Sequence, residues 1–321
     1  MDVASTQYQM FPEIEPFSSG MLDLDGHHKM YWEVSGNPEG RPILFLHGGP
    51  GAGASASHRR FFDPEHYRII VYDQRGAGRS KPFADVTDNT TQHLIADVER
   101  LREHLGIDGW LLFGGSWGSS LALAYAIAHP HRAQGMILRG LFLCTAAEVD
   151  WFLGGIARVF PEPWREFLEF LPDDERRNPL GSYHARLMSE DPTVHGPAAR
   201  TWARFEGACS TLLPNHRGVS GLESGRAALA LARIEAHYFV NGLFLPDTYF
   251  YDHLDTIRHL PAVIVQGRYD MVCPMITADA FTAAWPEADY MIVPDAGHSA
   301  MEPSIRSALV GCTERFKTRG I

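Results

Sequence analysis

A serine placed between glycines, with an aspartate and a histidine far downstream, offers the residue types needed for nucleophilic acyl transfer. The segment GGSWG (114–118) fits the pattern G-x-S-x-G, in which the serine stands on a sharp strand-to-helix turn. The pattern alone is weak, but an apolar run precedes it and a run rich in Ala and Leu follows it. We therefore expect Ser116 to be a nucleophile rather than a helix-capping serine.

A serine nucleophile needs a base to accept its proton and an acid to orient that base. Two strand-like runs downstream end in suitable residues: AVIVQG precedes Asp270, and YMIVPDAG precedes His298. Asp295 is a rival acid, but it lies only three residues before the histidine. We expect Asp270 to orient His298, and His298 to lie within hydrogen-bond reach of both Asp270 and Ser116.

Acyl transfer also needs hydrogen-bond donors for the developing oxyanion. The main-chain N–H of Trp117, directly after the nucleophile, is one candidate donor. The loop HGGPG (47–51) follows an early apolar run, and its glycines allow the main chain to approach a substrate closely. Alone, this loop could be a tight turn. Beside the serine turn, it is expected to supply the second donor from Gly49.

These residues require a scaffold that brings distant segments to one edge. Residues 21–34 indicate two short strands around an Asp-Gly turn. Short apolar runs that end in Gly, Asp or His predict strands buried on both faces of a parallel sheet; they span 42–47, 68–73, 110–115 and 134–140. Helix-like stretches alternate with them, one of them between Thr90 and Gly106. This order predicts an α/β fold with a doubly wound, mostly parallel sheet.

The alternation stops near residue 144. From about 145 to 241 the pattern is helical, and no strand-like run interrupts it. We interpret residues 145–241 as a helical cap domain inserted into a catalytic domain formed by 1–144 and 242–321. The first dozen residues are expected to form a loosely ordered arm.

Composition and charge exclude several function classes. The formal net charge of −11 argues against nucleic-acid binding, which uses an excess of Lys and Arg. No apolar run approaches the roughly 18 residues that span a membrane, and the N-terminus lacks the features of a signal peptide, so a cytoplasmic location is expected. The four cysteines are scattered without a CxxC pair, which predicts inert thiols and no metal site: Cys144, Cys209, Cys273 and Cys312.

Several segments together resemble the proline iminopeptidase family of the α/β-hydrolase superfamily: HGGPG, DQRGAGRS (73–80), GGSWGSS (114–120), GRYDMVCP (267–274) and GHS (297–299). The resemblance extends from about residue 15 to the C-terminus. It implies an α/β-hydrolase fold with a cap, and release of N-terminal proline from peptides or arylamides through an acyl-enzyme. It also implies that no metal or cofactor is used, and that Asp73 and Arg75 are structural ion-pair partners.

Two stretches of the expected cap are expected to determine substrate specificity. TWARFEG (201–207) and ARIEAHYF (232–239) are similar to family segments whose glutamates hold the substrate amine. The resemblance implies that Glu206 and Glu235 bind the ammonium group, with Trp202 and Phe205 beside the pyrrolidine ring. Arg139 is similar to a family arginine near the same site. The alternative is that both glutamates are solvated charges on helix faces.

Two positions depart from the family pattern. Phe205 stands where the family usually has Trp, and Ala236 where it usually has Asn. The partner implied by the resemblance is a small peptide or aminoacyl substrate with a free N-terminus, but these departures leave its strictness for proline open. The alternative function is a related esterase or amidase acting on a non-peptide substrate. Paired glutamates argue against that alternative, because a neutral ester offers no cation to bind.

Overall fold

The computed structural model describes residues 7–213 and 225–318. An eight-stranded sheet forms its centre, with the strand order β1-β2-β4-β3-β5-β6-β7-β8. The strands are β1 (Ser18–Asp23), β2 (Lys29–Gly36), β3 (Arg41–Leu46), β4 (Tyr67–Tyr72), β5 (Trp110–Ser116), β6 (Ala133–Leu141), β7 (Ala262–Gly267) and β8 (Asp289–Val293). β2 pairs antiparallel with both β1 and β4, and the other neighbouring strands pair in parallel. The predicted doubly wound, mostly parallel sheet is confirmed.

The central strands are buried on both faces because helices cover each side. α1 (Thr91–His104), α2 (Trp117–Ala128) and α11 (Met275–Ala284) contribute to one hydrophobic cluster, which also contains Leu44 and Leu46 of β3. α12 (Pro303–Thr318) and the short helix η1 (Ala56–Phe61) contribute to the other cluster, together with Ile43 and Phe45. Alternate residues of β3 therefore face opposite layers, which explains its continuous apolar sequence.

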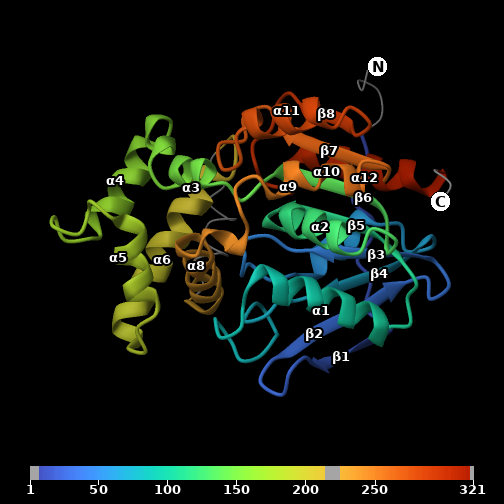
Figure 1. Ribbon diagram of the computed structural model, residues 1–321, viewed down its shortest axis with the longest axis horizontal. Helices are drawn as coiled ribbons and strands as arrows, with labels where there is room; N and C mark the ends of the chain where they lie inside the picture. The colour runs from blue at the N-terminus through green and yellow to red at the C-terminus, as the bar shows by residue number, and fades with distance from the viewer. Residues whose placement is uncertain (1–6, 214–224, 319–321) are drawn as a thin grey trace.

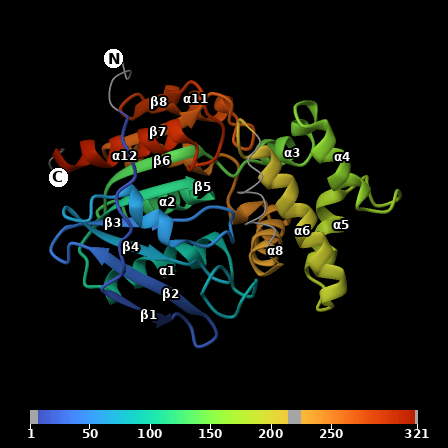
Figure 2. The same ribbon diagram turned by 180° about the vertical axis from the view of Figure 1, so that it is seen from behind.

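The chain between β6 and β7 contains helices and no strand wherever the structure describes it; residues 214–224 of the expected cap lie outside the described residues. Figures 1 and 2 show its longer helices gathered on one side of the sheet. The elements are α3 (Ala146–Phe152), η2 (Gly155–Arg158), α4 (Pro161–Glu169), α5 (Pro179–Leu187), α6 (Pro192–Cys209), α8 (Gly225–Val240), η3 (Gly242–Phe244), α9 (Tyr249–Asp252) and α10 (Leu254–Ile257).

The loop that follows β3 joins the sheet to these helices. A Cβ added at Gly51 would lie 2.6 Å from the carbonyl oxygen of Ala230 and 3.0 Å from Cβ of Ile234, both in α8. Gly51 also has a φ of +102°, which L side chains rarely adopt. A glycine is therefore needed where α8 packs over the carboxyl end of β3.

The N-terminal segment departs from the sequence expectation. Residues 1–6 lie outside the described residues, but the following residues are held in place rather than loose. The main-chain N–H of Tyr8 donates to Ser307 Oγ at 2.9 Å, and that of Phe11 donates to the Arg60 carbonyl at 2.9 Å. Both rings pack against the cluster under α12. The aromatic side chains hold this arm, although its sequence lacks a regular period.

The sequence interpretation also missed the helix α12, whose buried residues Ile305, Leu309, Cys312 and Phe316 recur at helical spacing. Among the described residues, no helix combines the length and apolar character needed to cross a membrane.

Candidate active site

Ser116 occupies the turn between β5 and α2 with φ 57° and ψ −130°. This conformation is rare for a residue with a side chain. Its neighbours must be glycines: a Cβ at Gly114 would lie 2.1 Å from the carbonyl oxygen of Gly118, and a Cβ at Gly118 would lie 2.2 Å from that of Leu46. The G-x-S-x-G spacing therefore follows from the close packing of β5, α2 and β3 around the serine.

The structure brings His298 and Asp270 together after β8 and β7. His298 Nδ1 lies 2.8 Å from Asp270 Oδ2, and both side chains are buried. Asp270 Oδ1 accepts hydrogen bonds from the main-chain N–H groups of Val272 and Cys273 at 3.1 and 2.8 Å. These donors hold the carboxylate in one orientation, so that Nδ1 of His298 carries the proton and Nε2 keeps its lone pair.

The expected contact between His298 and Ser116 is absent from the hydrogen bonds of the described residues. His298 Nε2 instead lies 3.1 Å from Arg139 Nη1, which also donates to the His298 carbonyl oxygen at 2.8 Å. Ser116 and the buried Cys273 line the same pocket. The prediction that His298 touches both partners is therefore wrong for this conformation, because the guanidinium group occupies the Nε2 lone pair that the serine would use.

Arg139, near the end of β6, therefore lies beside the histidine. Its guanidinium group also covers Gly115, where a Cβ would lie 2.4 Å from Nη2. Burial lowers the pKa of Arg139, and its Nε is buried without a hydrogen-bond partner.

The HGGPG loop lies against the nucleophile. A Cβ at Gly48 would lie 3.4 Å from Cβ of Ser116. Gln74 fixes the loop: its side-chain Nε2 donates to the His47 carbonyl at 2.8 Å, and its main-chain N–H donates to His47 Nε2 at 2.9 Å. Gln74 Oε1 also accepts from Trp117 Nε1 at 2.9 Å. One buried glutamine therefore connects the two segments that were predicted to supply oxyanion donors.

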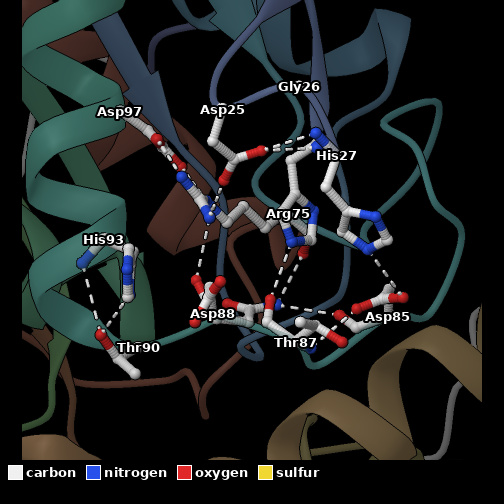
Figure 3. A network of polar contacts seen from close by, with 12 residues as sticks. Asp25, Gly26, His27, Arg75, Asp85, Thr87, Asp88, Thr90, His93 and Asp97 are labelled. Carbon is white, nitrogen blue, oxygen red and sulfur yellow. Dashed lines mark hydrogen bonds and ion pairs between the residues drawn. The ribbon is translucent and has the colours of Figure 1, made fainter.

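The DQRGAGRS segment is held by ion pairs, but its Asp73 and Arg75 do not pair with each other. Arg79 Nε donates to Asp73 Oδ2 at 2.6 Å. Arg75 binds Asp97 of α1 through two hydrogen bonds of 2.6 and 2.8 Å, and Asp25 through a third of 2.8 Å. Figure 3 shows Arg75 between these two carboxylates. The segment therefore ties the loop after β4 to α1 and to the β1–β2 turn.

A group of His27, His28 and Asp85 also belongs to this region, with one ring nitrogen or carboxylate oxygen from each residue within 4.8 Å of the others. Several of its polar atoms already have protein partners, whereas His28 Nδ1 is buried without one. His27 Nε2 lies 3.3 Å from Asp85 Oδ2, and His28 Nε2 lies 2.7 Å from the Thr87 carbonyl oxygen. The group thus contributes to the network that orders the loop between β4 and α1 (Figure 3).

A pocket of about 330 Å³, including space open to solvent, extends from the nucleophile to α8. Ser116 and Gly49 lie on it together with Glu235. Its other lining residues are mostly apolar: Phe142, Val149, Phe152, Phe239, Val272, Cys273 and Glu148. An apolar enclosure with a nucleophile and acidic groups suits a small ring that bears a positive charge.

Glu206 of α6 and Glu235 of α8 meet across the helix pair. Their carboxyl groups interact with each other. Glu235 is 4% exposed, and the Oε2 atom of Glu206 is buried without a hydrogen-bond partner. Burial raises the pKa of Glu206 to about 7, and burial together with the neighbouring carboxylate raises that of Glu235 well above its usual range. The alternative of solvated helix-face charges is wrong for this pair.

Trp202 and Phe205 lie close to the Glu206–Glu235 pair. Trp202 is fully buried, and its Nε1 donates to Glu235 Oε2 at 2.6 Å. The Phe205 ring packs against Phe152 and Phe167, with ring centroids 5.4 and 4.7 Å apart. Neither side chain lines the pocket. Their side chains contact Glu235 and Phe152, which do line it.

Sequence reasoning missed two site residues. Gln74 lies inside a motif that was recognised, so its position beside His47 could have been suspected. Glu148 had a weaker signal: it stands three residues after Thr145 in a capping box at the start of α3. Its buried carboxylate accepts from the N–H of Leu143 and lines the pocket. Burial raises its pKa.

The four cysteines are free and buried. Burial raises the pKa of Cys273 well above its usual range, so the group beside Ser116 is a neutral thiol rather than a reactive thiolate.

Comparisons with known proteins agree with this geometry. Residues 41–304 match the α/β hydrolase fold family. A proline iminopeptidase from Arabidopsis thaliana is 51% identical over 311 residues, which cover 96% of this chain and 82% of that protein. A proline iminopeptidase from Neisseria gonorrhoeae is 47% identical over 313 residues, covering 97% of this chain and 99% of that protein.

Solved structures with lower identity share the fold. An esterase from Exiguobacterium antarcticum has a TM-score of 0.66 at 17% identity, covering 94% of this chain and all of the other. A proline iminopeptidase-related protein from Thermus thermophilus has a TM-score of 0.59 at 23% identity, covering 92% of this chain and 96% of the other.

Proposed function

This chain belongs to the proline iminopeptidase family of α/β hydrolases, and we propose that it releases N-terminal proline from peptides and arylamides with Ser116 as its nucleophile. The observation that carries the proposal is the pocket that holds Ser116 at one end and Glu235, paired with Glu206, at the other. Its apolar side walls fit a pyrrolidine ring, and the carboxyl pair fits the secondary ammonium group of that ring.

In the first half-reaction, Ser116 Oγ attacks the carbonyl carbon of the prolyl residue. His298 Nε2 accepts the serine proton, and Asp270 stabilises the resulting imidazolium through Nδ1. The oxyanion receives hydrogen bonds from the main-chain N–H groups of Gly49 and Trp117. The imidazolium then gives its proton to the leaving amine, and the acyl-enzyme forms.

In the second half-reaction, His298 activates a water molecule that hydrolyses the prolyl ester on Ser116 and releases proline. Before the first step, His298 Nε2 must exchange its contact with Arg139 for one with the serine hydroxyl. Arg139 Nη1 also donates to the main-chain carbonyl of His298, so it keeps a partner when it leaves Nε2.

The helices of residues 145–241 serve as the cap that closes the acyl side of the site. α6 and α8 carry the two glutamates, and Phe152 of α3 lines the pocket between them and Ser116. A substrate whose scissile carbonyl lies at Ser116 directs its free N-terminus toward these helices. An N-acylated substrate brings no cation and leaves the carboxyl pair without a partner.

A hydrolysis panel tests the proposal. It compares prolyl, alanyl and leucyl p-nitroanilides, N-acetylprolyl p-nitroanilide and p-nitrophenyl acetate. We expect the highest kcat/KM among the anilides for the free prolyl compound, with a large loss on N-acetylation. A preference for the acetate ester with no prolyl-anilide hydrolysis would instead establish the esterase alternative.

A further inference from the structure

Two segments from distant parts of the chain are joined directly beside the catalytic histidine. One is the turn after β8 that carries His298, and the other is the stretch that follows the last turn of α6. The main-chain N–H groups of His298 and Ser299 both donate to the Ser210 carbonyl oxygen, at 3.2 and 2.8 Å. A single carbonyl of the α6 segment therefore holds two consecutive residues of the catalytic turn.

Glu302 closes a second connection between the same segments. Its Oε1 accepts from the main-chain N–H of Gly297 at 3.0 Å, and its Oε2 accepts from that of Leu212 at 3.1 Å. The segments lie so close that a Cβ at Gly297 would come within 2.9 Å of the Leu212 nitrogen. The Glu302 carboxylate thus bridges Gly297, which precedes the histidine, and Leu212, which lies two residues after Ser210.

The hydrogen bonds to Ser210 and Glu302 together form a clamp between the two segments. The α6 side of this clamp leads directly to the ammonium site. Ser210 Oγ donates to the Glu206 carbonyl oxygen at 2.7 Å, so the clamp begins one helical turn after Glu206. His298 has its own supports within the sheet domain, namely Asp270 at Nδ1 and Arg139 at its carbonyl oxygen. The Glu206 carboxyl group depends on its partner Glu235 and on the path of α6. Loss of the clamp should therefore displace the Glu206 carboxyl group more than the His298 imidazole.

We propose that Glu302 is a positioning residue that sets the spacing between the ammonium-binding glutamates and the catalytic triad. The inference rests on the proposed function, because it assigns the ammonium group to Glu206 and the scissile carbonyl to Ser116. In an N-terminal residue these two groups are separated by only the α-carbon, so the spacing of their binding sites must be held within a fraction of an ångström. The carboxylate achieves this by accepting hydrogen bonds from both segments.

The test compares E302A and E302Q with the wild-type protein on prolyl p-nitroanilide and p-nitrophenyl acetate. The ester lacks an ammonium group, so it reports on the triad alone. We expect kcat/KM for the prolyl substrate to fall about tenfold or more in E302A, and the ester value to change less than about threefold. E302Q should show the same selective loss in smaller measure, since its amide oxygen can accept from only one of the two segments.

D295N is the matched control. Asp295 is an exposed carboxylate in the same turn, and its Oδ2 accepts from Ser304 Oγ at 2.8 Å. Its neutralisation removes the same charge near His298 without touching the clamp, so both activities should stay close to wild type. Thermal unfolding of each variant identifies any general loss of stability, and E302Q decides the outcome if E302A does not fold.

A double-mutant cycle with E206Q separates positioning from a general structural role. If Glu302 acts through Glu206, the E206Q/E302Q variant should have the same kcat/KM for the prolyl substrate as E206Q alone, within about threefold. Equal losses on both substrates, no loss on either, or additive losses in the cycle would overturn the inference. Absence of prolyl hydrolysis in the wild-type protein would refute the proposed function instead, which is a different result.

Discussion

The carboxyl groups of Glu206 and Glu235 interact with each other, and among the described residues neither forms an ion pair. Two adjacent buried carboxylates repel each other when both are ionised, which favours retention of a proton by the pair when no cation is bound. A substrate ammonium group supplies the missing cation and displaces this proton. The affinity of the site for an ammonium ligand is therefore linked to pH.

The first prediction concerns this linkage. Because the pKa of Glu206 is raised to about 7, this carboxyl is protonated below that value and ionised above it. In the inactive Ser116→Ala protein, the Kd for prolinamide should fall as pH rises from 5 to about 7. It should then level off while the ligand amine, with a pKa of about 7.7–8.0 for an ordinary α-amino group, keeps its charge. Isothermal titration calorimetry measures this dependence.

The matched control for this prediction is Ser116→Ala/Glu206→Gln. Removal of one carboxyl removes the repulsion that helps to raise the pKa of Glu235, so the dependence that remains should report on Glu235 alone, with its pKa below the wild-type value of that residue. The enthalpy of binding in buffers of different ionisation enthalpy should reveal proton release near pH 6. Binding without proton release at that pH would rule out retention of a proton by the pair.

The second prediction concerns the ammonium site. Glu206→Gln and Glu235→Gln should each lower kcat/KM for prolyl p-nitroanilide roughly ten- to a hundredfold, because a hydrogen bond to a charged group contributes about 1.5–3 kcal/mol. Hydrolysis of p-nitrophenyl acetate should change little, since its acyl group does not reach the cap. Equal losses on both substrates would indicate that the glutamates only stabilise the cap.

The third prediction concerns the nucleophile. Ser116→Ala should lower kcat for prolyl p-nitroanilide by at least about a thousandfold, because the hydroxyl forms the acyl-enzyme. Its strained backbone persists with alanine, so thermal unfolding should stay close to wild type. A short burst of p-nitroaniline or p-nitrophenol from the wild-type protein would report the acyl-enzyme directly. Near-normal turnover by the alanine variant would refute the assignment of Ser116.

The fourth prediction separates the two candidate acids. Asp270→Asn should lower kcat by several orders of magnitude, because an amide at this position disturbs the tautomer and charge of His298. Asp295→Asn should leave kcat near its wild-type value, since Asp295 contacts Ser304 rather than the imidazole. Steady-state kinetics of the two variants decide between them, and the reverse order of losses would make Asp295 the orienting acid.

The fifth prediction concerns Cys273. Cys273 lines the pocket together with Ser116, but burial raises the pKa of its thiol and keeps it neutral. Cys273→Ser should therefore retain kcat within a few-fold of wild type, with the Asp270 contacts intact because they come from the main-chain N–H. Because a buried neutral thiol reacts slowly with maleimides, inhibition of the wild-type protein by a bulky maleimide should be slow and should be absent from this variant. Loss of turnover in a well-folded Cys273→Ser protein would give the thiol a catalytic role.

The sequence by itself determined the succession of strands and helices along the chain and the identity of the triad candidates. Buried parallel strands have continuous apolar sequences, so β3 to β8 were visible as short runs. The strained turn at Ser116 requires glycines at fixed positions. The turn can therefore be located in the sequence from GGSWG and from the apolar segments on either side of it. The sequence interpretation missed α12 and the held N-terminal arm; in the arm, Tyr8 and Phe11 are ordered by distant contacts with no local period.

Only the tertiary structure decided how the candidates are arranged. Arg139 stands 159 residues before His298, and no local pattern could show that it occupies the Nε2 lone pair. The structure also shows Trp202 donating a hydrogen bond to Glu235. The raised pKa values of Glu206 and Glu235 depend on the packing of α6 against α8, which buries their carboxyl groups. The chain's residues specify which groups exist, but burial and neighbours from other elements set their charge and their partners.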